Sequence, residues 1–168
     1  MVRPHLEYAN QIWSPYLCKH ILMLENVQRR FTRMIPGMRQ LSYENRLREL
    51  KLPSLAYRRL RGDMIETFKI VTGKYNISNN PFRIAQDRIT RGHHLKLLKS
   101  RARIEKRKNS FFSRVINPWN NLPARVVLSA NVKDFEKNLD IVWCNHPLLY
   151  NFATRSQAYW ELTSEAHL

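Results

Sequence analysis

The densest group of chemically active side chains in this sequence is a run of lysines and arginines that ends at Lys108. Residues 76–108 contain ten lysines and arginines against two acidic residues, a net charge of +8. The ten are Arg83, Arg88, Arg91, Lys96, Lys99, Arg101, Arg103, Lys106, Arg107 and Lys108. Cations at this density can neutralise phosphates and release condensed counterions, so the run favours a nucleic-acid backbone as its ligand. The alternative is a solvated loop. No element for reading base edges is visible, so contacts to backbone and shape are expected.

The rest of the charge is unevenly spread. The 168 residues include 29 Lys+Arg and 13 Asp+Glu, which gives a formal net charge of +16. Residues 1–75 have a net charge of +8, and residues 109–168 have a net charge of zero. Two further arginine clusters in the first part are either solvated helix faces or additional phosphate contacts. The candidate nucleic-acid-binding residues are therefore Arg29, Arg30, Arg33, Arg58, Arg59, Arg91, Lys96, Lys99, Arg101, Arg103, Lys106, Arg107 and Lys108.

Carboxylates are poorly arranged for phosphoryl-transfer chemistry. Nucleotidyl transfer with two metal ions needs acidic side chains that converge on both ions. The sequence contains no adjacent pair of aspartates, and its four aspartates each have Lys or Arg close by in the sequence. We expect Asp63, Asp87, Asp134 and Asp140 to form surface ion pairs, and we predict no catalytic residue.

The two cysteines each belong to a Cys-x-His motif, at Cys18 and at Cys144. Two such motifs contain the ligand types of a Cys₂His₂ zinc site. However, Cys18 and His20 are two residues apart on an expected helix, so their side chains point in different directions. We expect two thiols without a metal, and no cofactor. So few cysteines, no signal peptide and no membrane-spanning run favour a nuclear or cytoplasmic chain that is neither secreted nor membrane-bound.

Apolar spacing predicts a mostly α fold, a small helical domain with a basic loop or short β element between helix groups. Helices are expected over 14–37, 43–51, 54–73, 109–119 and 129–143, with a short extended element at 94–97. The first helix should bury a stripe formed by Leu17, Ile21, Leu24, Phe31 and Ile35. Gly62, inside the third helix, suggests a close helix approach. The expected parts are 1–75, 76–108, 109–144 and a poorly defined tail, 145–168.

Five phrases in order carry a family resemblance: "VRPHLEYANQIWSPY" (2–16), "LENVQRRFTRMIPG" (24–37), "LSYENRLRELKLPSLAYRRLRGDMIETFKIVTG" (41–73), "TRGHHLKL" (90–97) and "FFSRVINPWNNLP" (111–123). Together they resemble the region that follows the polymerase core in jockey-like non-LTR retrotransposon reverse transcriptases. Pro118 and residues 145–168 depart from the family pattern.

The resemblance implies that residues 1–75 are thumb-like and that the chain grips template or template–primer. The expected partners are RNA or an RNA–DNA duplex and the missing polymerase core, and the chain itself would perform no catalysis. The alternative is a relic or domesticated helical module that binds a protein and has no nucleic-acid role. In that case apolar residues such as Leu17, Ile21 and Phe31 would be exposed. A decayed fragment with a poorly stable fold is a third alternative.

Overall fold

The computed structural model describes residues 6–75, 77, 79–85 and 92–152. In these ranges the chain is mostly helical, which confirms the predicted fold class. The residues form two compact units, and each is described separately below. Unit 1 comprises residues 1–61 and 145–168, and unit 2 comprises residues 62–144. The boundary lies inside one helix, so the units do not follow the four sequence ranges expected above.

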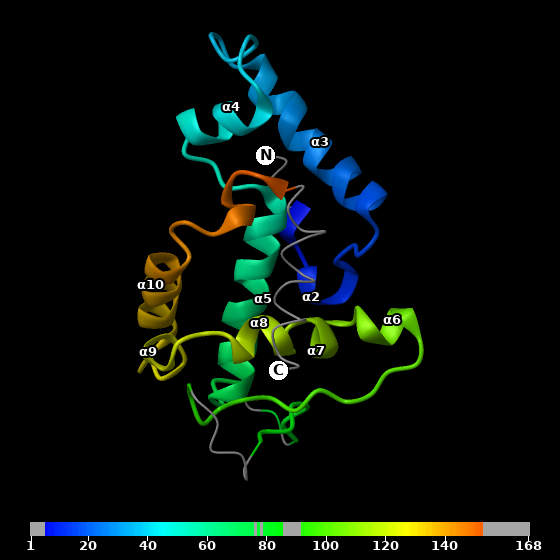
Figure 1. Cartoon of the computed structure of the whole chain (residues 1–168), viewed down its shortest axis with the longest axis vertical. Coiled ribbons are helices and arrows are strands. Elements are labelled where there is room, and N and C mark those ends of the chain that lie inside the picture. Colours follow the sequence, from blue (N-terminus) through cyan, green and yellow to red (C-terminus); the bar gives the residue numbers. More distant parts are fainter. Residues whose placement is uncertain (1–5, 76, 78, 86–91, 153–168) are drawn as a thin grey trace. The chain divides into compact units, whose positions relative to one another are not determined.

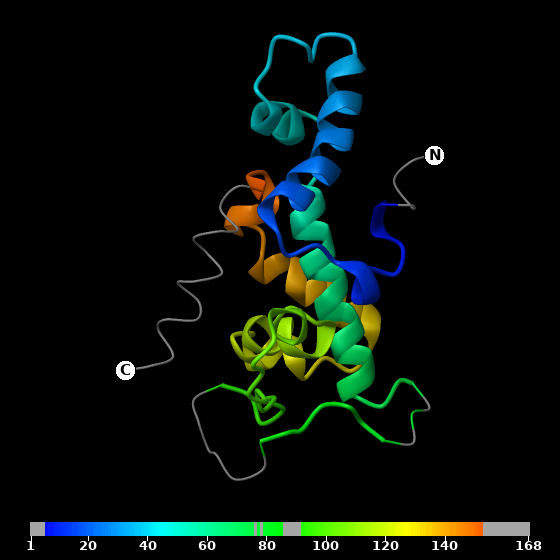
Figure 2. The same ribbon diagram turned by 90° about the vertical axis from the view of Figure 1, so that its right-hand side faces the viewer.

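Unit 1 contains α2 (Asn10–Trp13), α3 (Cys18–Met34), α4 (Tyr43–Glu49), the first turns of α5 (Leu55–Val71) and the 3₁₀ helix η1 (Pro147–Leu149). Helix α3 begins after Leu17 and has no side-chain cap, so it starts four residues later than the helix expected over 14–37. The short helix expected here is present as α4, and the Ser42 hydroxyl caps it by accepting a hydrogen bond from the Asn45 N–H. Figures 1 and 2 show α3 followed by α4 along the chain.

The start of α5 organises the buried part of unit 1. The Ser54 hydroxyl accepts from the Tyr57 N–H and donates to the carbonyl of Leu148, at 3.1 and 2.6 Å. The Ser54 N–H donates to the Leu149 carbonyl at 2.8 Å. The turn at η1, which the sequence left undefined, is therefore fastened to the amino end of α5.

Glu25 of α3 also lies at the start of α5, although it is a fully buried acidic residue. Its carboxylate accepts from the Leu55 N–H at 3.2 Å and from the Tyr43 hydroxyl at 2.6 Å. Burial raises the pKa of Glu25, while these donors act in the opposite direction. One acidic side chain thus joins α3, α4 and α5 and satisfies a backbone N–H that the first turn of a helix leaves unpaired.

Unit 2 contains the remainder of α5 together with α6 (Glu105–Lys108), α7 (Phe111–Arg114), α8 (Ile116–Asn120), α9 (Ala124–Val127) and α10 (Val132–Val142). Its core includes Phe68 and Phe135, whose rings stack 4.4 Å apart, and the fully buried Trp119, 6.1 Å from Phe135. These aromatic rings are therefore core residues.

The helix predicted over 109–119 is divided at Val115 into α7 and α8. Pro118 lies in the first turn of α8, where its missing N–H has no helical partner to lose. The helix α10 is capped by Asn131, whose side chain accepts from the Asp134 N–H. A Cβ added at Gly62 would meet nothing within 4 Å, so the close approach predicted there is wrong.

Among the described residues, no helix combines the length and the apolar character that a bilayer crossing requires.

Candidate nucleic-acid interface

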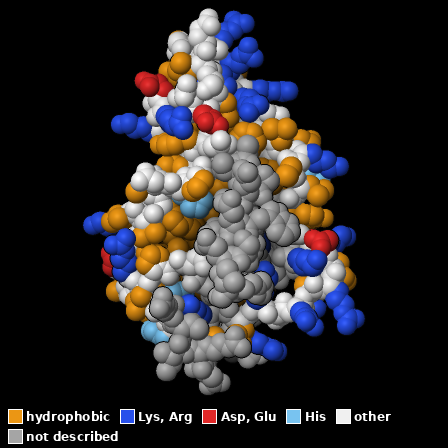
Figure 3. Space-filling view, viewed as in Figure 1, with side chains coloured by type: hydrophobic (Ala, Val, Ile, Leu, Met, Phe, Trp, Pro, Cys, Tyr) orange, Lys and Arg blue, Asp and Glu red, His pale blue; other side chains and the backbone are white. Residues whose placement is uncertain are grey.

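The basic segment, residues 96–108 in unit 2, contains seven Lys and Arg and one acidic residue. Its exposed cations are Lys99, Arg101, Arg103, Lys106, Arg107 and Lys108, and Lys96 is half-buried. The one acid, Glu105, pairs with Lys108 within α6. Figure 3 shows Lys and Arg side chains gathered around α6 with one acidic group among them. Six of the seven cations of the segment are therefore exposed.

The first half of this segment has irregular backbone, with no helix or strand assigned between residues 98 and 103. Cations alternate with small or apolar residues here, at Lys99, Arg101 and Arg103. In an extended chain, alternate side chains share one side and are about 6.6 Å apart. In an extended conformation this spacing places three cations on one side, an arrangement that can follow a phosphodiester strand.

The amino end of the basic segment is held by backbone pairing. The Leu98 N–H donates to the Arg83 carbonyl and the Ala85 N–H donates to the Lys96 carbonyl, both at 2.8 Å. Between them lies a single antiparallel bridge from Ile84 to Leu97. The short β element predicted at 94–97 is thus reduced to one bridge, at its last residue.

Asn120 of α8 supplies the next support. Its side-chain oxygen accepts from the Leu97 N–H at 2.8 Å, and its side-chain nitrogen donates to the Leu97 carbonyl at 2.9 Å. The Asn120 amide therefore pairs with both backbone groups of Leu97, as a neighbouring strand would. Sequence reasoning missed this role, because nothing in "PWNNLP" indicates which backbone the asparagine side chain meets.

Trp119 and His93 hold the residues that precede the basic segment. The Trp119 indole N–H donates to the Leu95 carbonyl at 2.8 Å. His93 is buried, with its Nε2 3.2 Å from the Trp119 carbonyl, and burial lowers the pKa of its imidazole. A side chain buried against Trp119 is not placed to contact a phosphate.

The carboxyl end of the segment is fixed through a buried ion pair. Arg114 of α7 donates from Nε to Asp63 Oδ2 at 2.8 Å and from Nη2 to Asp63 Oδ1 at 3.0 Å. Its Nη1 also donates to the Asn109 carbonyl, one residue beyond α6, at 3.4 Å. Asp63 was expected in a surface ion pair, and that prediction is wrong because both side chains are buried.

The arginine clusters of unit 1 differ from the basic segment. Arg59 is 3% exposed with its guanidinium over the Trp13 ring, so the prediction that it contacts a phosphate is withdrawn. Arg58 is half-buried and pairs with Glu7 at 2.9 Å. Arg29 is half-buried over the Tyr43 ring, 5.0 Å from its centroid. Only Arg30 and Arg33 are exposed.

Arg91 lies outside the described residues, as does Asp87. Cys18 and Cys144 are free and exposed. No cluster of His, Cys, Asp or Glu suited to a metal ion is found among the residues that the structure describes.

The chain was compared with known proteins at three levels. It matches no protein-family model, no curated protein and no solved structure.

Proposed function

We propose that the chain binds RNA or an RNA–DNA duplex through backbone phosphates, and that the basic segment is its contact surface. The observation that carries the proposal is the run of six exposed cations from Lys99 to Lys108 with one acidic side chain among them. The resemblance to the post-core region of retrotransposon reverse transcriptases supports a template strand as the ligand. The role is binding without catalysis.

The supports described above favour a preformed surface. A flexible cationic tail loses conformational freedom when it binds, whereas a segment fixed at both ends loses less. The Leu97 backbone is paired with Asn120, and Asn109 accepts from Arg114. These two contacts bracket Lys99 to Lys108 and restrict the backbone between them.

The test is the salt dependence of binding to a labelled RNA–DNA duplex. The variant replaces Arg101, Arg103, Lys106 and Arg107 by Gln. Four lost phosphate contacts lower the slope of log K against log salt by about 3, at roughly 0.7–0.9 per contact. Circular dichroism checks that the variant is folded.

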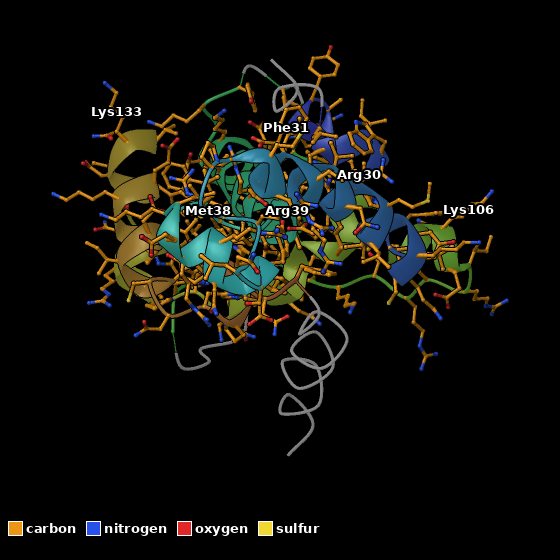
Figure 4. The ribbon with its side chains drawn as sticks, turned by 90° about the horizontal axis from the view of Figure 1, so that it is seen from above. Arg30, Phe31, Met38, Arg39, Lys106 and Lys133 are labelled. Carbon is orange, nitrogen blue, oxygen red and sulfur yellow. The ribbon has the colours of Figure 1, made fainter. Side chains whose placement is uncertain are left out.

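A matched control removes the same charge elsewhere in unit 2. It replaces Lys74, Arg125, Lys133 and Lys137, four exposed cations outside the segment, by Gln. Figure 4 shows Lys106 and Lys133 on opposite sides of that view. The control should keep nearly the full slope. Equal losses in both variants would mean that net charge alone attracts the duplex, and an unchanged slope in the segment variant would overturn the proposal.

A further inference from the structure

Helix α3, in unit 1, has lines of side chains on two of its faces. The fold of unit 1 buries the more polar line. The buried residues of the helix are Ile21, Glu25 and Thr32. Gln28 continues the same line and donates from its side chain to the Pro53 carbonyl at 3.0 Å. The sequence stripe predicted as core is therefore wrong except at Ile21, and the remaining apolar side chains need another explanation.

Five of those apolar side chains, together with His20, form a second line with heptad spacing. Its positions are separated by three and four residues alternately, at Leu17, His20, Leu24, Val27, Phe31 and Met34. Leu17, Phe31 and Met34 are 40%, 52% and 79% exposed, and Leu24 and Val27 are half-buried. We call this line the α3 seam. Such spacing is the pattern by which one helix packs along another.

Cations lie on the exposed side of the helix beside the seam. Arg30 and Met23, 66% exposed, are next to the seam on the flank that faces away from the buried line, and Lys19 and Arg33, also exposed, lie further round the helix. The one acidic residue of the helix, Glu25, belongs to the buried line, so no acidic side chain of α3 lies on that flank. Figure 4 labels Arg30 and Phe31 on α3, with Met38 and Arg39 in the turn that follows. Figure 3 shows hydrophobic and cationic side chains together over this part of the chain.

We propose that the α3 seam packs against an amphipathic helix of a partner protein whose apolar stripe is bordered by Asp and Glu. The charge complements the cationic flank, and the apolar stripe covers Phe31 and Met34. A second copy of this chain would bring further cations to the same border, given its net charge of +16. A phosphodiester strand would neutralise the arginines, but its phosphates would leave the apolar line uncovered. The 17 residues of α3 span about 25 Å, room for more than two heptads.

The test uses two synthetic helical peptides, each about three heptads long with Leu at the core positions. One has Glu at the flanking positions and the other has Lys. Fluorescence anisotropy measures their binding to the full chain. The Glu peptide should bind at least about tenfold more tightly than the Lys peptide, a difference of about 1.4 kcal/mol. Equal binding of the two peptides would overturn the proposal.

Two variants locate the contact. Phe31→Gln keeps the net charge and changes an exposed residue, and it should weaken Glu-peptide binding about tenfold or more. Ile141→Gln is the control, because Ile141 is an apolar residue of α10 with similar exposure, 54%. The double variant Arg30→Glu, Arg33→Glu should lose the Glu peptide and gain the Lys peptide. Equal effects of Phe31→Gln and Ile141→Gln would contradict the assignment.

The same Phe31→Gln variant tests whether the seam instead binds a second copy of the chain, a lipid surface or a nucleic acid. Sedimentation, binding to phosphatidylserine vesicles and binding to the RNA–DNA duplex are each compared with the unsubstituted chain. All three should be unchanged. A dimer, vesicle binding or duplex binding that depends on Phe31 would assign the seam to that ligand and overturn an acidic partner helix. The seam is tested independently of the basic segment. The variant that replaces four cations of that segment by Gln should bind the Glu peptide as tightly as the unsubstituted chain does.

Discussion

The basic segment and the α3 seam are both cationic, yet they differ in what accompanies the charge and in what holds them. In the basic segment the exposed cations lie on irregular backbone and on the short helix α6, and the exposed apolar side chains among them, Leu98 and Ile104, are six residues apart and form no helical line. In the α3 seam the cations border Phe31, Met34 and other apolar side chains on a regular helix. Charge alone suits a polyanion, whose binding falls steeply with salt, whereas charge beside an apolar line suits an amphipathic partner.

The supports differ in the same way. The basic segment depends on side chains of other elements, namely Asn120, Trp119 and Arg114. The α3 helix makes its own backbone hydrogen bonds and is joined to its neighbours by a few polar side chains, chiefly Glu25 and Gln28. A surface on irregular backbone is therefore more sensitive to a single distant substitution than a surface on a helix. The following predictions test that difference.

The largest effect is expected from Arg114→Met in unit 2. It leaves the Asp63 carboxylate buried without its guanidinium, and breaking a buried pair in this way costs about 3–5 kcal/mol of the free energy of unfolding. Urea unfolding followed by circular dichroism measures the loss. The control is Arg125→Met, an exposed arginine of α9, which should stay within about 0.5 kcal/mol. Similar losses in both variants would show that the pair does not support unit 2.

A smaller effect is expected from Tyr43→Phe in unit 1. The variant removes the hydroxyl that donates to the buried Glu25 carboxylate, a charge-assisted hydrogen bond worth about 1.5–3 kcal/mol. Glu25 keeps its hydrogen bond from the Leu55 N–H, so the loss should be less than for Arg114→Met. Tyr16→Phe, at a residue 45% exposed, is the matched control. If the Tyr43→Phe variant were as stable as the control, the hydrogen bond from Tyr43 to Glu25 would not stabilise unit 1.

The smallest effect concerns pH and involves one histidine in each unit. Burial lowers the pKa of both His93 and His146 below the ordinary 6.5. The unfolded chain then binds protons more readily than the folded chain, so stability falls as pH drops below about 6.5 and the loss is complete below the folded pKa values. Urea midpoints measured between pH 7.5 and 5 should therefore decrease. Glu25, whose pKa is raised, acts in the opposite sense.

The variant His146→Asn separates the histidine contribution of unit 1. The Nδ1 of His146 accepts from the Leu148 N–H at 3.2 Å, and an asparagine side chain can accept the same bond without titrating in this range. The variant should therefore show a shallower decrease in midpoint with falling pH. An unchanged pH profile would exclude His146 as a contributor.

The sequence by itself determined the helical fold class, the density of cations between residues 96 and 108, and the positions of some helix ends. Ser42 at the start of α4 and the apolar spacing of α10 follow from short-range geometry, because caps and periodicity depend on residues a few positions apart.

Only the tertiary structure decided which face of α3 is buried and which cations are exposed. Periodicity indicates that apolar residues share a face, but not whether the chain covers that face. Glu25 could replace an apolar contact because Leu55 and Tyr43, distant in sequence, donate hydrogen bonds to it. Arg59 and Arg101 are both arginines in basic runs, yet one is buried beside Trp13 and the other is exposed. The neighbours that make this difference are brought together by folding, so local sequence does not specify them.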